Sequence, residues 1–200
     1  MNRIVISGYL EENPEFLYEL KGEKFYKVNL VSERLSGLQD VLPCIVPDIF
    51  ARLLSKNDYV RFAGDIRTRN VMTEGKRKLE IYVFVNEVYE YEAGESDENC
   101  VEIDGFICKD AIYRKTPLGR EITDLLVASN RRYGKSDYIP CIAWGRNAKK
   151  TANLEVSEQV RIIGRFQSRE YLKTLESGET VSHTAYEVSI SKVEIGGQSE

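Results

Sequence analysis

The two halves of this 200-residue chain carry the same short blocks in the same order, and this repeat restricts the folds open to the chain. The block LPCIV at 42–46 returns as IPCIA at 139–143, which is 97 positions later. The beginnings of the two halves align in the same register, and farther on the offset grows to 100, where Gly64 falls on Gly164. Matching blocks with matching glycines predict two copies of one domain, each of about 95 residues.

A short stretch rich in acidic residues, with one glycine and little apolar content, separates the two copies. This composition is typical of a linker, and a short linker keeps the domains that it joins close together. We therefore expect a first domain at 1–91, a linker at 92–98, a second domain at 99–196 and a short tail at 197–200.

Both copies show the alternation of apolar and polar residues that is typical of strands. In the second copy the pattern predicts a helix at 146–155 and strands at 100–110, 120–129, 138–145, 159–172 and 184–195. Gly164 lies inside the fourth strand, where a glycine indicates a bulge or a sharp bend. Three strands, a helix and two strands fit the OB-fold, a five-stranded barrel that often binds single-stranded nucleic acid. The predicted fold class is all-β with one short helix per unit, arranged as two tandem five-stranded OB-fold barrels. Another small β-barrel with a structural helix fits the same order, and fold alone does not give function.

Three segments of the second copy resemble the bacterial single-stranded-DNA-binding protein family. They are KTPLGREITDLLVASNRR, YIPCIAWGRNAKKTANL and EQVRIIGRFQSREY. The family has a Thr-Pro-x-Gly turn, a strand that ends near Asn-Arg-Arg, an aromatic residue and glycine before the helix, and a Gly-Arg strand with a following aromatic residue. The resemblance covers most of 99–195, whereas the first copy matches mainly in its framework. It implies non-catalytic, largely sequence-independent binding of single-stranded DNA, in replication, recombination or repair, and it does not discriminate DNA from RNA.

Sequence-tolerant binding of single strands combines aromatic faces, on which bases stack, with cations for the phosphate backbone. The aromatic positions of the family fall here on Tyr133, Tyr138, Trp144 and Tyr171. Tyr133 and Tyr171 can also be read as ordinary surface residues, and the strand face that Tyr138 and Trp144 share can be read as core. The candidate cations around them are Arg114, Lys115, Arg131, Arg132, Arg165, Arg169 and Lys173.

The first copy departs from this pattern at the aromatic positions. Val41, Pro47 and Val71 stand where the second copy has Tyr138, Trp144 and Tyr171. The whole acidic excess of the chain also lies in residues 1–97, which weakens contact with phosphates. We therefore expect a degenerate ligand face in the first domain, with secondary contacts from cations near one hairpin: Arg67, Arg69, Lys76, Arg77 and Lys78.

The resemblance also implies association of subunits, so we expect a homodimer with four OB domains. The chain stops at EIGGQSE, and we expect no acidic tail that recruits partners. A second hypothesis is an OB-fold protein-interaction module of a primosome or recombination complex, with weak or no DNA binding. The acidic first copy and its missing aromatics favour that alternative.

Several function classes are excluded by motifs that the sequence lacks. A P-loop, an H-E-x-x-H motif and Cys/His metal spacing are absent, so we expect no enzyme, no metal and no cofactor. No signal peptide pattern and no membrane-length apolar run occur, so we expect a cytoplasmic, nucleoid-associated protein without membrane contact. The four cysteines should then be reduced and mostly buried, with Cys44 and Cys141 as equivalent core residues.

Overall fold

A computed structural model describes residues 1–73, 75–90, 98–131, 134–174, 178 and 180–196. The first half contains β1 (Asn2–Leu10), β2 (Glu15–Leu20), β3 (Glu23–Glu33), β4 (Gln39–Pro47), α1 (Asp48–Ala51), β5 (Tyr59–Thr73) and β6 (Lys76–Glu90). The second half contains β7 (Asn99–Ile107), β8 (Ile112–Lys115), β9 (Glu121–Asn130), β10 (Ser136–Trp144), α2 (Arg146–Thr151), β11 (Gln159–Thr174) and β12 (Thr180–Ile195). The predicted tail and almost all of the predicted linker lie outside the described residues.

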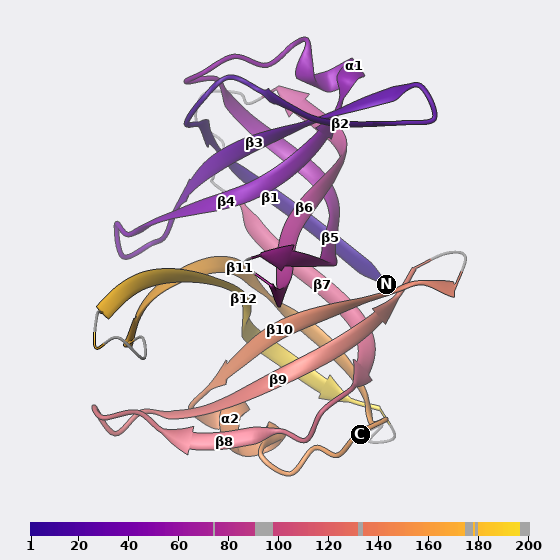
Figure 1. The fold of residues 1–200 in the computed structure, drawn as a ribbon. Helices are drawn as coiled ribbons and strands as arrows, with labels where there is room; N and C mark the ends of the chain where they lie inside the picture. Colours follow the sequence, from indigo (N-terminus) through magenta and orange to yellow (C-terminus); the bar gives the residue numbers. More distant parts are fainter. Residues whose placement is uncertain (74, 91–97, 132–133, 175–177, 179, 197–200) are drawn as a thin grey trace.

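The strand pairings close a circuit in each half. In the first half β1 pairs with β3, β3 with β4, β4 with β6, β6 with β5, and β5 returns to β1. In the second half the same circuit runs through β7, β9, β10, β12 and β11. Only β4–β6 and β10–β12 are parallel among these pairs in the described part of the chain. The all-β prediction with one short helix per half is therefore confirmed (Figure 1).

Two strands that the sequence did not predict stand outside the circuits. β2 forms a hairpin with β3, and β8 forms one with β9. Every residue of β8 is exposed, so this strand lacks the apolar alternation by which a half-buried strand is recognised. The turn expected before β9 is present, and Gly119 there has a φ of 76°. The helix begins at Arg146 as predicted but ends at Thr151, several residues before the expected end.

The expected bend inside the long strand occurs in both halves. The β5–β6 register shifts between Ala63 and Gly64, and the β11–β12 register shifts between Ile163 and Gly164. A Cβ atom on either glycine would collide with a carbonyl oxygen of the paired strand. Glycine is required there by this close approach of two backbones.

The interior of each circuit is filled by the inward-facing side chains of its strands. Cys44 and Cys141 are both buried, as expected for equivalent core positions, and burial raises the pKa of both thiols. The expectation that most thiols are buried is wrong for Cys100, which is exposed on β7, and Cys108 is partly exposed. All four cysteines are free.

The first strands of the two halves join the circuits into one 12-stranded sheet. β1 and β7 pair antiparallel, with Asn2 opposite Ile103 and Ile6 opposite Asn99. The centre of this pairing places Ile4 opposite Val101, which are equivalent positions of the repeat. The two halves are thus related by an approximate twofold axis through this pair, with the first half above the second in Figure 1.

Asp40 fixes one side of the boundary between the halves. Its buried carboxylate accepts hydrogen bonds from Arg34 at 2.6 and 2.8 Å and from the backbone N–H and hydroxyl of Ser168 at 2.8 and 3.0 Å. Arg34 also donates to the Ser168 carbonyl at 2.8 Å, and Arg165 approaches Asp40 at 3.6 Å. These four residues form the Asp40 cluster.

The equivalent residues fix the other side. Asp137 is buried, pairs with Arg131, and accepts a hydrogen bond from the Thr68 backbone N–H at 2.6 Å. Arg131 donates to the Thr68 carbonyl at 3.0 Å. These three residues form the Asp137 cluster. Charge-assisted hydrogen bonds of this kind are strong, so the clusters hold the two halves in a defined relative position.

Candidate nucleic-acid interface

The two aromatic residues predicted on one strand both lie on the outer face of the second half. Tyr138 and Trp144 point away from the circuit interior, because the alternate residues Ile139 and Cys141 point inward and are buried. The Tyr138 side chain is 45% exposed, and Trp144 is half-buried at the end of β10. The placement of Tyr138 on an accessible surface argues against the interpretation of this face as core.

A finger made by β11 and β12 adds a second aromatic group. The rings of Tyr171 and His183 stack with centroids 5.6 Å apart, and the Arg169 guanidinium lies 5.9 Å from the Tyr171 centroid. Tyr171 is 41% exposed, while Arg169 also pairs with Glu187 at 3.4 Å. Sequence reasoning did not select His183, although its place opposite Tyr171 in the hairpin could have been read from the strand pattern.

Two of the predicted cations lie at the edge of the same outer face, on β8. Arg114 is opposite Ile122, which in turn is opposite Trp144, so the three residues form one row across the sheet. Arg114 pairs with Asp124 at 2.8 Å on the surface, and Lys115 is exposed. Exposed ion pairs are weak, so a phosphate can compete for Arg114.

The structure places two other predicted cations at the boundary between the halves instead of beside Tyr138 and Trp144. Arg131 belongs to the Asp137 cluster, and Arg165 belongs to the Asp40 cluster. Burial lowers the pKa of the Arg165 guanidinium, although the charge of Asp40 opposes this shift. Arg165 contacts Asp40 of the first half, and Arg131 donates to the Thr68 carbonyl of the first half. Such contacts between distant segments could not be predicted from the local sequence.

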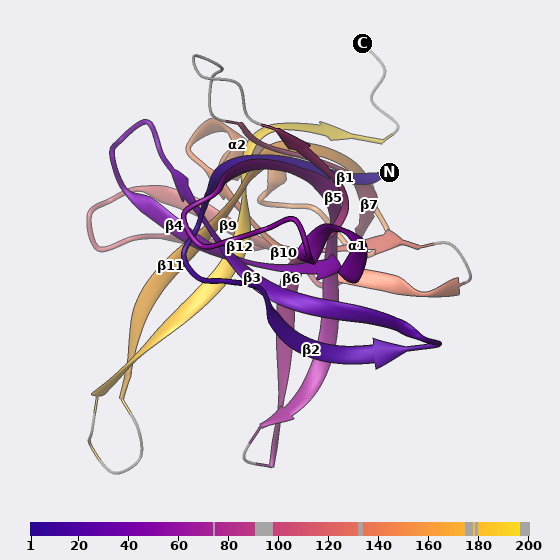
Figure 2. The same ribbon diagram turned by 90° about the horizontal axis from the view of Figure 1, so that it is seen from above.

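The remaining predicted residues fall into two groups. Arg132 and Tyr133 lie outside the described residues, as do the side chains of Lys76 and Lys173. The secondary cations of the first half that the structure describes are all on the β5–β6 finger: Arg67, Arg69, Arg77 and Lys78. Figure 2 shows this finger and the β11–β12 finger extending from the same side of the body.

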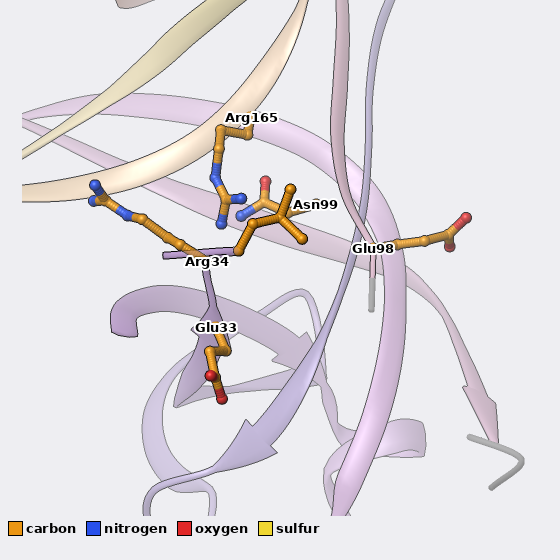
Figure 3. A pocket seen from close by; sticks show the side chains of 6 residues that line it. Glu33, Arg34, Glu98, Asn99 and Arg165 are labelled. Atoms are coloured by element: carbon orange, nitrogen blue, oxygen red, sulfur yellow. The ribbon is translucent and has the colours of Figure 1, made fainter. Parts of the chain in front are cut away.

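A cavity of about 440 Å³ opens at the boundary, next to the Asp40 cluster. Figure 3 shows Arg34 and Arg165 approaching it from the two halves, with Asn99 beside Arg165 and the Glu98 side chain turned away. Glu33 and Leu35 complete its lining. The charges around this cavity balance, so it lacks the excess positive charge that an anion would require.

Other kinds of site find no support in the described residues. Within those ranges, no three His, Cys, Asp or Glu side chains are grouped so that they could hold a metal ion. Nor does the described part contain a helix with the length and apolar character needed to cross a membrane.

Comparison with known proteins agrees with this distribution of features. The model of the single-strand binding protein family matches residues 98–195, which is the half that carries Tyr138, Trp144 and the β11–β12 finger. The second half of the chain belongs to the single-strand binding protein family. This confirms the family resemblance seen in the sequence.

Curated relatives carry the same family name. The single-stranded DNA-binding protein of Clostridium tetani is 35% identical over 80 residues, which is 36% of this chain and 55% of that protein. Single-stranded DNA-binding protein 3 of Clostridium acetobutylicum is 32% identical over 80 residues, with 36% and 56% covered. The chain therefore spans about half the length of the curated relatives that it matches.

Solved structures extend the likeness of fold to the first half. A crystal structure of the single-stranded DNA binding protein from Thermus aquaticus superposes with a TM-score of 0.78 at 20% identity, covering 100% of this chain and 95% of that one. A deletion variant of that protein gives the same TM-score at 19% identity, with 96% of its chain covered. At this identity the likeness shows the fold alone, but it includes both halves in their relative placement.

Proposed function

We propose that this protein binds single-stranded DNA without catalysis and largely independently of base sequence, mainly through the outer face of its second half. The observation that carries the proposal is the set of solvent-accessible aromatic side chains, Tyr138 and Trp144 on β10 and the Tyr171–His183 stack on the β11–β12 finger, in the half that belongs to the family. Bases stack on such surfaces whatever their identity, because every base has a π-face. Arg169, Arg114 and Lys115 are in place for the phosphates.

The proposal includes two tandem OB barrels, with domains near 1–91 and 99–196. The closed strand circuits and the equivalent β-bulges of the two halves support it. We further propose a homodimer with four OB domains, acting in replication, recombination or repair at the nucleoid. Sedimentation that shows a strict monomer at micromolar concentration would contradict the dimer.

The test uses Trp144, the only tryptophan of the chain, as the reporter. Oligo-dT should quench its fluorescence, and the affinity should fall steeply as salt rises, since released counterions drive phosphate binding. Replacing Tyr138 by serine should weaken binding by about 1–3 kcal/mol, the contribution of one stacked base. Absence both of quenching and of any anisotropy change of a labelled oligonucleotide at low salt would refute the proposal.

A second candidate function is a protein-interaction module, and one loop favours it. Leu35 and Leu38 are exposed between β3 and β4, where the second half has Arg132 and Lys135. Apolar residues at a loop tip suit a protein partner better than a phosphate backbone. Purification of one stoichiometric partner that is lost in a Leu35→Ser, Leu38→Ser variant, together with negligible DNA binding, would decide for this alternative.

A further inference from the structure

The outer face of the first half also carries aromatic side chains, although the sequence comparison had found none at the expected positions. Tyr82 and Phe84 lie on β6 and point outward, because the alternate residues Ile81, Val83 and Val85 are buried in the circuit. Both rings remain partly exposed. The expected degeneracy of this face therefore concerns the strand β4 and not the whole surface.

The strand register shows which positions of the two halves correspond. In the first half Ile45 of β4 is opposite Phe84 of β6, and in the second half Ile142 of β10 is opposite Ser189 of β12. Ile45 and Ile142 are equivalent in the repeat, so Phe84 occupies the place of Ser189. By the same register, Tyr82, two residues before Phe84, occupies the place of Glu187, two residues before Ser189.

The two halves thus carry aromatic pairs on different strands, β10 in the second half and β6 in the first. The second half has Trp144 and Tyr138 on β10, with serine and glutamate on the neighbouring β12. The first half has Pro47 and Val41 on β4, with its two aromatics on the neighbouring β6. Phe84 is opposite Ile45, which is on the same face of β4 as Val41 and Pro47, so the β6 aromatics are on the equivalent outer face.

Cations accompany the β6 aromatics. The Arg67 guanidinium lies 5.4 Å from the Phe84 ring centroid, and the Arg69 guanidinium lies 5.7 Å from that of Tyr82. Each arginine also pairs with a neighbouring carboxylate, at 2.6 and 2.8 Å. The Arg69–Glu80 pair is 40% and 41% exposed and therefore weak, which leaves Arg69 able to exchange its carboxylate for a phosphate. The Arg67–Asp65 pair is less exposed, and Arg67 contributes positive charge beside Phe84.

The Phe84 ring packs against aromatic side chains of the neighbouring strands. Tyr18 of β2 stacks on Phe25 of β3 at 5.0 Å, and Phe25 lies 5.8 Å from Phe84. Phe25 itself is buried and belongs to the packing. Phe84 therefore rests on a fixed layer, which reduces the entropy that it would lose on binding a base.

This surface adjoins the proposed binding face of the second half. The backbone N–H of Tyr138 donates to the Thr68 hydroxyl across the boundary, at 2.9 Å. Thr68 lies between Arg67 and Arg69 on β5, and Arg67 is opposite Tyr82 in the strand register. The last aromatic residue of the second-half face is therefore next to the strand that carries the cations of the first.

We propose that a bound single strand continues from Tyr138 across the boundary onto Tyr82 and Phe84, with Arg67 and Arg69 holding its phosphates. This second stacking surface rests on the proposed function, since it extends the path of the same ligand. The chain then binds with both halves, through aromatics at non-equivalent positions.

The test compares oligonucleotides of two lengths on the full chain. Oligo-dT of about 8 nucleotides fits one OB unit, and oligo-dT of about 30 nucleotides spans both, given site sizes of roughly 4–16 nucleotides per unit. The variant Tyr82→Gln, Phe84→Ser should bind the long oligonucleotide more weakly than wild type, by about 5- to 150-fold for each base that loses its stacking partner. Its affinity for the short oligonucleotide should be unchanged, and its occluded site on poly(dT) should be smaller.

Tyr89→Ser provides the matched control, because Tyr89 is an exposed tyrosine at the far end of the same strand. It should bind both lengths as wild type does. If the double variant binds the long oligonucleotide as tightly as wild type, with an unchanged site size, the second surface is refuted while the proposed function stands. If wild type binds neither length, the proposed function itself fails.

A second measurement does not depend on the folding of a variant. Wild-type protein is irradiated with oligo-dT in which 5-iodouracil replaces some of the thymines, and the adducts are mapped to peptides. Adducts on Tyr82, Phe84 or Tyr18 support the second surface. Adducts confined to the second half, at full occupancy by the long oligonucleotide, overturn it.

Discussion

Replacing Asp40 by asparagine tests whether the boundary clusters hold the two halves together. The buried carboxylate of Asp40 accepts four hydrogen bonds, two from Arg34 and two from Ser168 of the other half. The Arg165 guanidinium lies 3.6 Å from the same carboxylate. The substitution keeps the shape of the side chain but leaves two guanidinium groups without their counter-charge.

The magnitude follows from the burial of these groups. Removal of one partner from a buried ion pair costs about 3–5 kcal/mol. The side chains of Arg34 and Arg165 are 25% and 28% exposed, so water compensates part of the loss, and we expect about 3 kcal/mol. Asp137→Asn should cost less, because the Asp137 cluster has one arginine where the Asp40 cluster has two.

The assay is urea unfolding, followed by far-UV circular dichroism and by Trp144 fluorescence. With a denaturant dependence of about 2 kcal/mol per M, the midpoint should fall by about 1.5 M. Glu194→Gln is the control, since Glu194 forms an exposed pair with Lys192 and its loss should leave the midpoint unchanged. A shift below about 0.5 M for Asp40→Asn, or a larger one for Asp137→Asn, would refute the reasoning.

The same cluster predicts a dependence on pH. Burial alone would raise the pKa of Asp40, but the hydrogen bonds from Arg34 and Ser168 outweigh burial, and the pKa lies below its ordinary value. A carboxyl group of this kind stabilises the fold above its unfolded pKa, about 3.9, and this stabilisation is lost as the pH falls through the folded pKa. Wild type should therefore lose stability below about pH 4, and Asp40→Asn should lose less over the same range.

Three further predictions concern single sites. Cys44 and Cys141 should not react with a thiol reagent in the native protein, because both are buried, whereas Cys100 is exposed and should react; mass spectrometry of the labelled peptides checks this. Gly164→Ala should lower the thermal unfolding temperature, because its Cβ would collide with the paired strand, and a thermal midpoint equal to that of wild type would contradict this. Tyr171→Ser should weaken oligo-dT binding by about 1–3 kcal/mol without lowering stability, as measured by fluorescence titration and thermal unfolding.

The parts of the fold that sequence predicted are those set by local pattern. The glycines at the β-bulges, the strand order and the start of the second helix all follow from residues that are close together in the chain. The two strands that the sequence did not predict are β2, which pairs with β3, and β8, which pairs with β9. β8 has no buried residue and therefore shows no alternation of apolar and polar residues. The sequence predicts Arg131 and Arg165 as phosphate ligands because they are cations near aromatics, but contacts between the halves determine their positions.

The comparison of the two copies describes positions in the chain and not the surface that they form. Position-by-position alignment asks whether an aromatic residue persists at one place in the chain, and it finds Pro47 where the second half has Trp144. A ligand contacts a surface, and the surface combines strands that are distant in sequence. β6 lies beside β4 in the sheet, so an aromatic residue gained at Phe84 can replace one lost at Pro47.

The boundary clusters make such a replacement effective. In two separate subunits of one sequence, any substitution appears on both faces at once, because the subunits are identical. Here the two halves are joined by β1 and β7, and the Asp40 and Asp137 clusters fix their relative position. Each face can then change independently while its distance to the other is retained. The two halves therefore share one strand framework, and the boundary clusters fix how their outer faces are placed relative to each other. Those outer faces carry different side chains, so under the proposed function they would offer a bound single strand different contacts.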